Sequence, residues 1–422
     1  MTQRERRQQA RLYPKGGLRG RVRGLAAVGA GVVLASSFTG VSSAADSVGQ
    51  PPTHPRLADV NTVTVTSTPI VSGLASPTAV VSAPGTSRLF VAERRGTVRI
   101  VKGSRLKPRA YLDVRSRVSS SGGEQGLLGL AFPPTFRSKP VIYFTYTGRS
   151  GALVLARARA TKAGRNRVDA KTIRTILRVP HPKYTNHNGG SLTFGPDGYL
   201  YLGTGDGGGG GDPFLTAQNL SELRGKILRL NVSRSCGRKR YCVPPSNPYA
   251  SGKGARRIVW ARGLRNPWRI TTDAVTGDLW VADVGEHEQE EINVLPLGAG
   301  GRNLGWSCKE GNTTFNSGQC AGLGGFVMPV VTLCHTGLSG CAPDRASDTV
   351  IGGYVYRGAA YPGHQGVYLF SDFIDGNMYA YADGQFAKVG KLGLVTSFGQ
   401  TNSRELVALT YRGTLHSLAL GS

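Results

Sequence analysis

The sequence is poor in acidic residues for its length. It has 25 Asp and Glu against 52 Lys and Arg in 422 residues, which gives a formal net charge of +27. Such an excess of positive charge favours anionic partners, for example wall phosphates or acidic polysaccharide. The basic residues are dispersed, and no helix-turn-helix, zinc-finger or RNA-binding signature accompanies them. Nucleic acid is therefore not expected as a partner.

A long hydrophobic run is also missing, so no membrane-spanning helix, which needs about 20 apolar residues, is expected. The N-terminal region instead has eight Lys or Arg within residues 1–24, an uncharged run of 11 residues over 25–35, and then VSSAAD. This order is typical of a cleaved signal peptide ending near Ala44, and it leaves the export route open. We predict a signal peptide over 1–44, a disordered proline-rich lead over 45–61, and a protein that is secreted or associated with the cell wall.

Cysteine is scarce, and no CxxC pair occurs, which argues against a zinc site. The six cysteines all follow residue 235, and an even number in an exported chain suggests disulfides. Fifteen connectivities are formally possible. The cysteines nevertheless fall in local pairs, which are Cys236 with Cys242, Cys308 with Cys320, and Cys334 with Cys341.

Helix signals are sparse, and the best of them, residues 216–230, is interrupted by Gly225, so it fits one turn followed by a strand. Aromatic and aliphatic strand patterns recur instead, in six segments: 88–100, 141–147, 198–206, 277–285, 367–381 and 405–418. A repeated antiparallel sheet protects its edges best when the copies are arranged radially. We predict an all-β fold, a six-bladed β-propeller over residues 62–422 with long loops on one face.

Residues 185–211, TNHNGGSLTFGPDGYLYLGTGDGGGGG, combine a histidine, two strand patterns and an acidic glycine loop. The GPDG turn between 191–194 and 199–204 predicts a hairpin, which places His187 and Asp206 at the same edge of the sheet. A base that works at neutral pH, a carboxylate and small neighbours indicate a ligand site. The simpler alternative is a glycine turn whose histidine satisfies a backbone carbonyl.

Further motifs are GEQGLLGLAF with Glu124, RGLRNPWR with Arg265 and Asn266, DVGEHEQEEIN over 283–293, GRNLGW over 301–306, and GGYVYRG over 352–358. Each of them is also consistent with an ordinary turn or a solvated loop. The acidic stretch brings carboxylates and bent backbone together, and Ca²⁺ prefers such oxygen ligands.

Taken together and in this order, the motifs resemble the soluble glucose/sorbosone dehydrogenase family, from about residue 70 to the C-terminus. The resemblance implies a propeller that oxidises an aldose sugar with pyrroloquinoline quinone and Ca²⁺. It implies His187 as general base, assisted by Arg265, and Asp206 as a contact of the sugar. The implied cofactor contacts are Glu124, Arg265 and Asn266. The carbonyls of Gly285 and Glu286 match a calcium site at the cofactor, and Glu291 with the carbonyl of Leu304 matches a second calcium site.

The basic residues depart from the family pattern. No lysine lies between Lys309 and Lys388, the C-terminal segment offers only Arg404, and Ser191 stands where a basic residue often follows the histidine loop. These absences resemble the branch related to hedgehog-interacting proteins, in which the propeller is a binding module. Two functions follow: a quinone-dependent sugar dehydrogenase whose electron acceptor is unknown, or a non-catalytic, calcium-binding propeller for anionic wall polysaccharide or a protein partner. A lactonase on a similar propeller is a third, favoured only by the acidic loop.

Overall fold

The computed structural model describes residues 59–160, 162, 166–252 and 257–421. The predicted signal peptide and most of the predicted lead lie outside the described residues. In the described part, no helix is long and apolar enough to cross a membrane. The first strand, β1 (Thr64–Val71), begins just after a short turn at residues 60–62.

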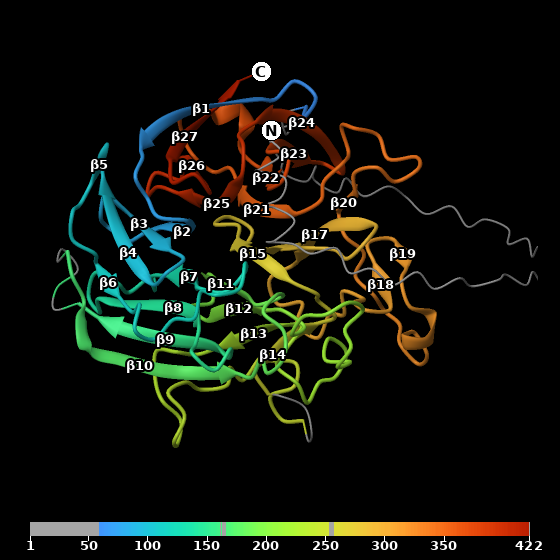
Figure 1. Cartoon of the computed structure of the whole chain (residues 1–422), viewed down its shortest axis with the longest axis horizontal. Coiled ribbons are helices and arrows are strands. Elements are labelled where there is room, and N and C mark those ends of the chain that lie inside the picture. Colours follow the sequence, from blue (N-terminus) through green and yellow to red (C-terminus); the bar gives the residue numbers. More distant parts are fainter. Residues whose placement is uncertain (1–58, 161, 163–165, 253–256, 422) are drawn as a thin grey trace, which may run out of the picture.

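Six sheets surround a central axis, and each contributes one innermost strand (Figure 1). These strands contact one another in sequence order, and the last contacts the first, so the ring is closed. Closure removes the open edges that separate sheets would expose. The predicted six-bladed β-propeller is confirmed. The innermost strands are β2 (Pro77–Ser82), β7 (Leu127–Ala131), β11 (Gly189–Phe194), β15 (Pro267–Thr272), β21 (Val350–Val355) and β25 (Val395–Gln400).

Each of the six predicted strand segments contains the second strand of one blade. A second strand pairs on both sides and packs on both faces, which explains its aromatic and aliphatic composition. Most residues of these strands are buried. The second strands are β3 (Arg88–Glu93), β8 (Val141–Thr147), β12 (Leu200–Thr204), β16 (Leu279–Asp283), β22 (Tyr368–Asp372) and β26 (Leu406–Thr410).

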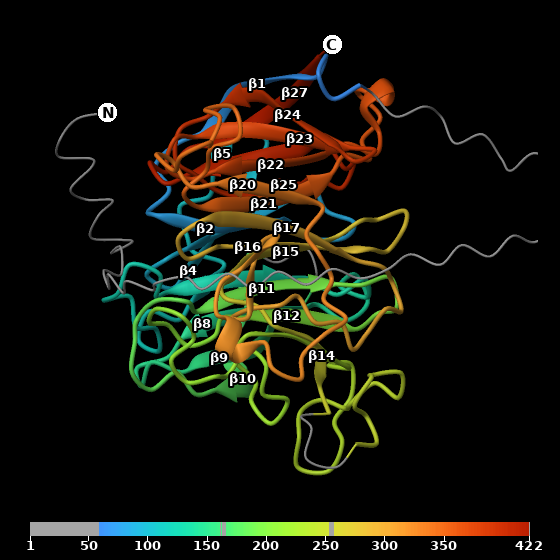
Figure 2. The same ribbon diagram turned by 90° about the vertical axis from the view of Figure 1, so that its right-hand side faces the viewer.

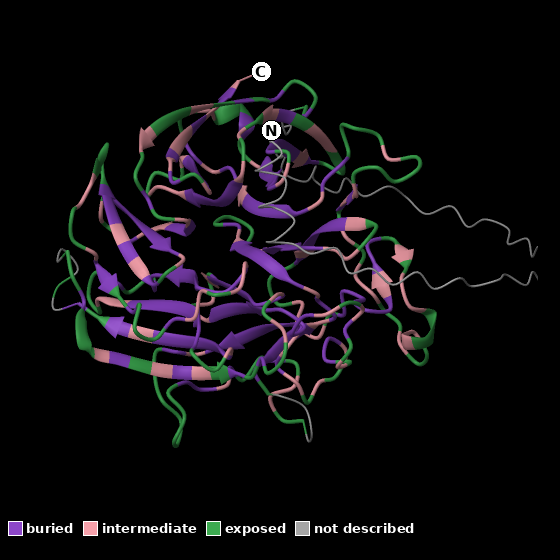
Figure 3. Ribbon diagram, viewed as in Figure 1, coloured by how far each residue is buried: buried purple, intermediate pink, exposed green. Residues whose placement is uncertain are grey.

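Outer strands are more exposed than inner ones, as the mixed colours of β10 show (Figure 3). Besides β1, the outer strands are β4 (Thr97–Lys102), β5 (Arg105–Leu106), β6 (Leu112–Asp113), β9 (Leu153–Arg159), β10 (Asp169–Val179), β13 (Lys226–Leu230), β14 (Val259–Arg262), β17 (Gln289–Leu295), β20 (Val331–Cys334), β23 (Asn377–Ala382), β24 (Gln385–Lys391) and β27 (Leu415–Gly421). Short elements complete the described chain: β18 (Lys309–Glu310), β19 (Thr313–Thr314) and the 3₁₀ turns η1 (Ser317–Gln319) and η2 (Pro362–His364).

The two ends of the described chain meet in one blade. Strand β1 pairs antiparallel with β27, so the N-terminal strand completes the sheet formed by the C-terminal strands (Figure 2). The three predicted disulfides are present, Cys236–Cys242, Cys308–Cys320 and Cys334–Cys341. The segment of residues 216–230 forms turns followed by β13, as its glycine interruption indicates.

The antiparallel order gives the propeller two different faces. The innermost strands begin at one face, here called the histidine face. The loops that follow the second strands lie at this same face. The turns between innermost and second strands lie at the opposite face, here called the turn face. Strands β11 and β12 pair with Gly189 opposite Thr204, which confirms the predicted hairpin and places the residues on either side of it at the histidine face.

Candidate functional site

His187 and Asp206 form a hydrogen-bonded pair at the histidine face. Nδ1 of His187 lies 2.8 Å from Oδ1 of Asp206, and their side chains are 4% and 0% exposed. Nε2 of His187 has no hydrogen-bond partner among the described residues, and this atom is not fully buried. A histidine whose Nδ1 is held by a carboxylate leaves Nε2 to exchange a proton with a ligand.

Both carboxylate oxygens of Asp206 are engaged within the protein. Oδ1 also accepts the amide of Gly208 at 2.9 Å, and Oδ2 accepts the indole N–H of Trp306 at 2.8 Å. Burial raises the pKa of Asp206, but the charge and hydrogen bond of His187, with help from Arg265, lower it by more, so the net pKa is below its usual value. Asp206 therefore stays ionised, and its geometry suits orientation of His187. Its predicted contact with a sugar stays a prediction.

The backbone holds His187 in a left-handed conformation, with φ of 52°. Its amide donates to Oε2 of Glu124 at 2.7 Å, which also accepts Nδ2 of Asn266 at 3.0 Å. Oδ1 of Asn266 accepts the amide of Gly189 at 3.1 Å. A Cβ on Gly205 would lie 1.9 Å from the carbonyl oxygen of His187, so only glycine fits beside this turn. Three blades thus support the conformation of one histidine.

Arg265 lies beside the pair and is already neutralised. Its Nε donates to Oε2 of Glu286 at 2.9 Å, and one terminal nitrogen donates to the carbonyl of Val284 at 3.0 Å. The guanidinium carbon lies 5.7 Å from the ring centre of Trp306. The structure therefore brings Arg265 to the predicted site, where the carboxylate of Glu286 balances its charge.

The stretch predicted to bind calcium, residues 285–291, forms a tight turn around the carboxylate of Glu310, a residue that the sequence analysis did not single out. The amides of Glu286, His287, Glu288 and Gln289 all lie within 2.7–3.2 Å of Oε1 of Glu310. Gly285 is packed so closely that a Cβ would lie 1.9 Å from the carbonyl oxygen of Gln289. Because these amides point to Glu310, their carbonyls face away from it. Oε2 of Glu310 is buried and has no partner in the described part of the chain.

Glu291 and Asp283 lie opposite each other on β17 and β16. Burial, together with the nearby negative charge of Asp283, raises the pKa of Glu291 to about 8. Burial, opposed by the amides of Arg265 and Asn266, raises the pKa of Asp283 to about 7. Leu304 is buried, and its amide donates to the carbonyl of Arg262 at 2.9 Å. Among the described residues, no three His, Cys, Asp or Glu side chains are grouped to hold a metal, so both predicted calcium sites stay predictions.

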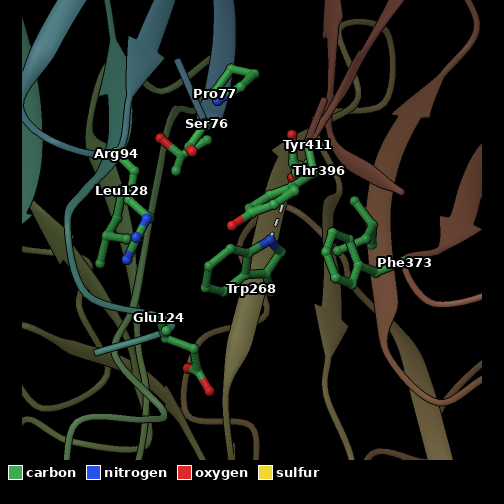
Figure 4. Close-up of a pocket in the computed structure, with 12 residues that line it drawn as sticks. Ser76, Pro77, Arg94, Glu124, Leu128, Trp268, Phe373, Thr396 and Tyr411 are labelled. Atoms are coloured by element: carbon green, nitrogen blue, oxygen red, sulfur yellow. Dashed lines mark hydrogen bonds between the residues drawn. The ribbon is translucent and has the colours of Figure 1, made fainter. Parts of the chain in front are cut away.

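A narrow cavity opens beside Glu124 at the histidine end of the central axis (Figure 4). Trp268, Phe373 and Tyr411 provide flat apolar walls, and Arg94 lines one side. Nη1 of Arg94 donates to the carbonyl of Gly122 at 2.8 Å, whereas its Nε is buried without a partner in the described structure. No sequence motif indicated Arg94, which comes from the turn between β3 and β4.

Two departures noted in the sequence have structural counterparts. Arg404 lies in the turn between β25 and β26, which is at the turn face and so on the opposite side of the propeller from His187. Ser191 is buried in β11, and its Oγ accepts the amide of Ile270 at 3.0 Å, so it links two blades. Neither position supplies a positive charge to the site.

The fold and the buried histidine–aspartate pair define a β-propeller with a candidate acid–base site. Residues 74–371 match the model of the Glucose / Sorbosone dehydrogenase family, which covers more than half of the chain. The chain therefore belongs to that family.

Similar proteins include a hedgehog-interacting protein, which represents one of the two branches indicated by the sequence. The HIPL2 protein of Arabidopsis thaliana is 32% identical over 288 residues, 58% of this chain and 40% of the relative. The hedgehog-interacting protein of Mus musculus is 34% identical over 225 residues, 50% of this chain and 32% of that protein. The chain thus spans less than half the length of these relatives.

A solved structure has the same fold. The pyrroloquinoline quinone-bound form of aldose sugar dehydrogenase from Streptomyces coelicolor superimposes with a TM-score of 0.62, covers 85% of this chain and 98% of that chain, and is 23% identical. At this identity the likeness concerns the fold alone.

Proposed function

We propose that the protein is an exported sugar dehydrogenase in which His187 accepts the proton of a sugar's anomeric hydroxyl while a hydride leaves the same carbon. The observation that supports this role is the pair of His187 and Asp206, in which Nδ1 lies 2.8 Å from the carboxylate and Nε2 has no hydrogen-bond partner among the described residues. Family membership supports the sugar as substrate.

Four residues of this chain would have distinct roles in the reaction. Nε2 of His187 takes the proton, so that the electrons of the O–H bond form a carbonyl as the hydride departs. Asp206 keeps the proton of His187 on Nδ1 and stabilises the imidazolium that results. The amide contact with Glu124 fixes the backbone of His187. Arg265 lies next to the pair, and its guanidinium would stabilise the negative charge that the hydride acceptor gains.

Pyrroloquinoline quinone is the hydride acceptor that the family implies, and when bound it supplies two-electron chemistry that no side chain offers. The cavity beside Glu124 has aromatic walls and a guanidinium whose buried Nε has no partner in the described part of the chain, which suits the chemistry of a flat anionic molecule. Its volume is about 30 Å³, so its walls would have to move apart to admit the quinone. Arg94 and Glu124 line this cavity and would contact the group, and Arg265 and Asn266 are the further contacts that the resemblance implies.

Calcium is the proposed second cofactor. Oε2 of Glu310 is buried without a partner in the described structure, and the pKa values of Asp283 and Glu291 are raised, which together indicate an excess of buried negative charge. A bound cation relieves such an excess. The carbonyls of Gly285 and Glu286 would face the cofactor, and Glu291 with the carbonyl of Leu304 would form the second site.

The test is reconstitution of the purified protein with the quinone and Ca²⁺, followed by dye reduction with a panel of aldoses. We expect turnover, and we expect His187→Gln to lower kcat by about 10²–10⁴-fold with little change in the melting temperature. His416→Gln, on outer strand β27, is the matched control and should retain full activity. A His187→Gln variant that melts several degrees lower yet keeps its activity would give His187 a structural role.

A non-catalytic propeller that binds an anionic polysaccharide or a protein partner is the second candidate. It is favoured by the neutralisation of Arg265 through Glu286, by Arg404 lying on the opposite face, and by the similarity to a hedgehog-interacting protein. In that case reconstitution yields neither the quinone's bound spectrum nor turnover at micromolar cofactor.

A further inference from the structure

A second cavity opens at the turn face, between the blade of β7–β10 and the blade of β11–β14. Its volume is about 470 Å³. It is bordered by the loop that joins β7 to β8, by one face of β8 and β9, and by the turn between β11 and β12. The proposed dehydrogenase site lies at the other end of these same strands, so the two sites are separate.

The lining of this cavity contains cations and no carboxylate. Lys139, Arg157 and Arg159 all border it, and no Asp or Glu does. None of the three cations has an ion pair within 4.0 Å among the described residues. Asp169 lies opposite Arg159 on the next strand, but its Oδ1 accepts the amide of Lys171 at 2.9 Å.

Two arginines on neighbouring strands, Arg157 and Arg174, face each other, which lowers the stability of the sheet. Arg157 of β9 lies directly opposite Arg174 of β10, and like charges opposite each other on paired strands destabilise a sheet. Nη1 of Arg174 donates to the carbonyls of Lys171 and Ile173, so it turns to its own strand instead of to a carboxylate. A repulsive pair beside a cavity without acids fits an anionic ligand that balances the charge when bound.

Most of the remaining lining is apolar or aromatic, and Thr135, Ser138 and Ser233 add hydroxyl groups. Tyr143 lies opposite Arg157 across β8 and β9, and its ring centre is 5.5 Å from that of Phe194. The hydroxyl of Tyr143 donates to the carbonyl of Val232 at 3.1 Å, so the ring is held in place. Prolines at 133, 134 and 140 also border the cavity. Aromatic and proline surfaces match the C–H faces of a sugar ring, and guanidinium groups match its carboxylate or phosphate.

We propose that this cavity binds an anionic sugar residue, one that carries a carboxylate or a phosphate group, through Arg157 and Arg159. The site would anchor the protein to an acidic polysaccharide or a sugar-phosphate polymer and leave the histidine face open. Because the two faces are separate, this binding does not depend on the proposed dehydrogenase activity.

The experiment is calorimetric titration of the whole protein with D-glucuronate, with glucose 6-phosphate and with neutral D-glucose, at low and at physiological salt. We expect saturable binding of at least one of the two anionic sugars, weaker at higher salt, and little heat from glucose. Binding of glucuronate alone identifies a carboxylate ligand, and binding of glucose 6-phosphate alone identifies a phosphate ligand. Binding of both indicates recognition of the anionic charge itself.

Two double variants distinguish binding at this cavity from nonspecific attraction to the positive charge of the protein surface. Arg157→Gln with Arg159→Gln should weaken binding about tenfold or more, since it removes the two forked donors. Arg105→Gln with Arg109→Gln removes the same charge from exposed positions on another blade and should change affinity less than about twofold. If the Arg157→Gln, Arg159→Gln double variant has a lower melting temperature than the parent, Arg159→Gln alone provides the test, because the Arg159 side chain is exposed.

Three results with the parent protein and the two double variants would overturn the proposal: no saturable binding of either anionic sugar, equal binding of glucose, or equal weakening by the control pair. The variant His187→Gln should bind both anionic sugars like the parent. If it loses that binding, the anionic sugar occupies the histidine face and the proposal fails independently of any measurement of turnover.

Discussion

Replacing Asp206 by asparagine tests the orientation of His187 most directly, because the two side chains have the same shape. The carboxylate accepts three hydrogen bonds, two at Oδ1 from His187 and Gly208 and one at Oδ2 from Trp306. An amide has only one acceptor oxygen. If that oxygen takes the Oδ1 position, the NH₂ group faces the indole N–H. If it takes the Oδ2 position, the NH₂ group faces His187 and the amide of Gly208.

Each arrangement leaves at least one buried donor without an acceptor, which costs about 1–3 kcal/mol. The second arrangement also forces Nδ1 of His187 to accept a hydrogen bond, so the proton moves to Nε2 and the base loses its lone pair. In a Ser-His-Asp triad, the corresponding change of tautomer lowers kcat by about 10⁴-fold. We therefore expect Asp206→Asn to lower turnover by about 10²–10⁴-fold and to lower the melting temperature by several degrees.

Turnover is measured by dye reduction after reconstitution, and the tautomer of His187 is read separately from nitrogen–proton correlations in the NMR spectrum of labelled protein. The control is Asp113→Asn, at a side chain that is 45% exposed and pairs with Arg115 at the surface. It should change neither quantity. An Asp206→Asn variant with parental turnover, or with Nε2 still unprotonated, would refute the assigned role of Asp206.

Three further outcomes are expected. Burial lowers the pKa of His335, but its hydrogen bond to Glu290 and the negative charges of Glu290, Glu310 and Asp348 together raise it by more, so its protonated form stabilises the fold. This stability is present below about pH 6.5 and is lost as pH rises through the raised pKa, so the melting temperature should fall from pH 6 to pH 8, and less so in His335→Gln. Excess chelator should lower the melting temperature, and Glu291→Gln should reproduce that effect. An unchanged melting curve, together with a metal analysis that finds no calcium, would refute the proposed calcium site. Replacing Cys308 and Cys320 by serine opens a loop with a sequence separation of 12 and should cost about 3 kcal/mol in denaturant unfolding, whereas an unchanged midpoint would contradict the loop-closure estimate.

The sequence predicted the architecture well because the features that define it are local. A second strand of each blade is buried on both sides, so its run of aliphatic and aromatic residues is visible without knowledge of its neighbours. The three disulfides close short loops, with sequence separations of 6, 12 and 7, and this favoured the local pairs. The hairpin between His187 and Asp206 likewise depends on a four-residue turn.

The family resemblance placed Glu124, Arg265 and Asn266 at the site, and the structure brings all three to the histidine face. It does so through contacts over long sequence distances, 63 residues between Glu124 and His187 and 142 residues between Glu124 and Asn266. No local pattern encodes such contacts, since they form only when the ring of blades closes. Sequence reasoning therefore missed Glu310 and Arg94, whose surrounding residues resemble ordinary turns.

The sequence by itself determined the class of fold, the number of blades and the histidine–aspartate hairpin, and it favoured the local disulfide pairs, because strand burial and short turns leave a periodic or local trace. Only the tertiary structure decided what each site residue touches. It buried Asp206 against Trp306 and His187, paired Arg265 with Glu286, and put Arg404 on the opposite face. The physical reason is that charge balance and hydrogen-bond satisfaction are properties of neighbours in space, and in a propeller those neighbours come from different blades.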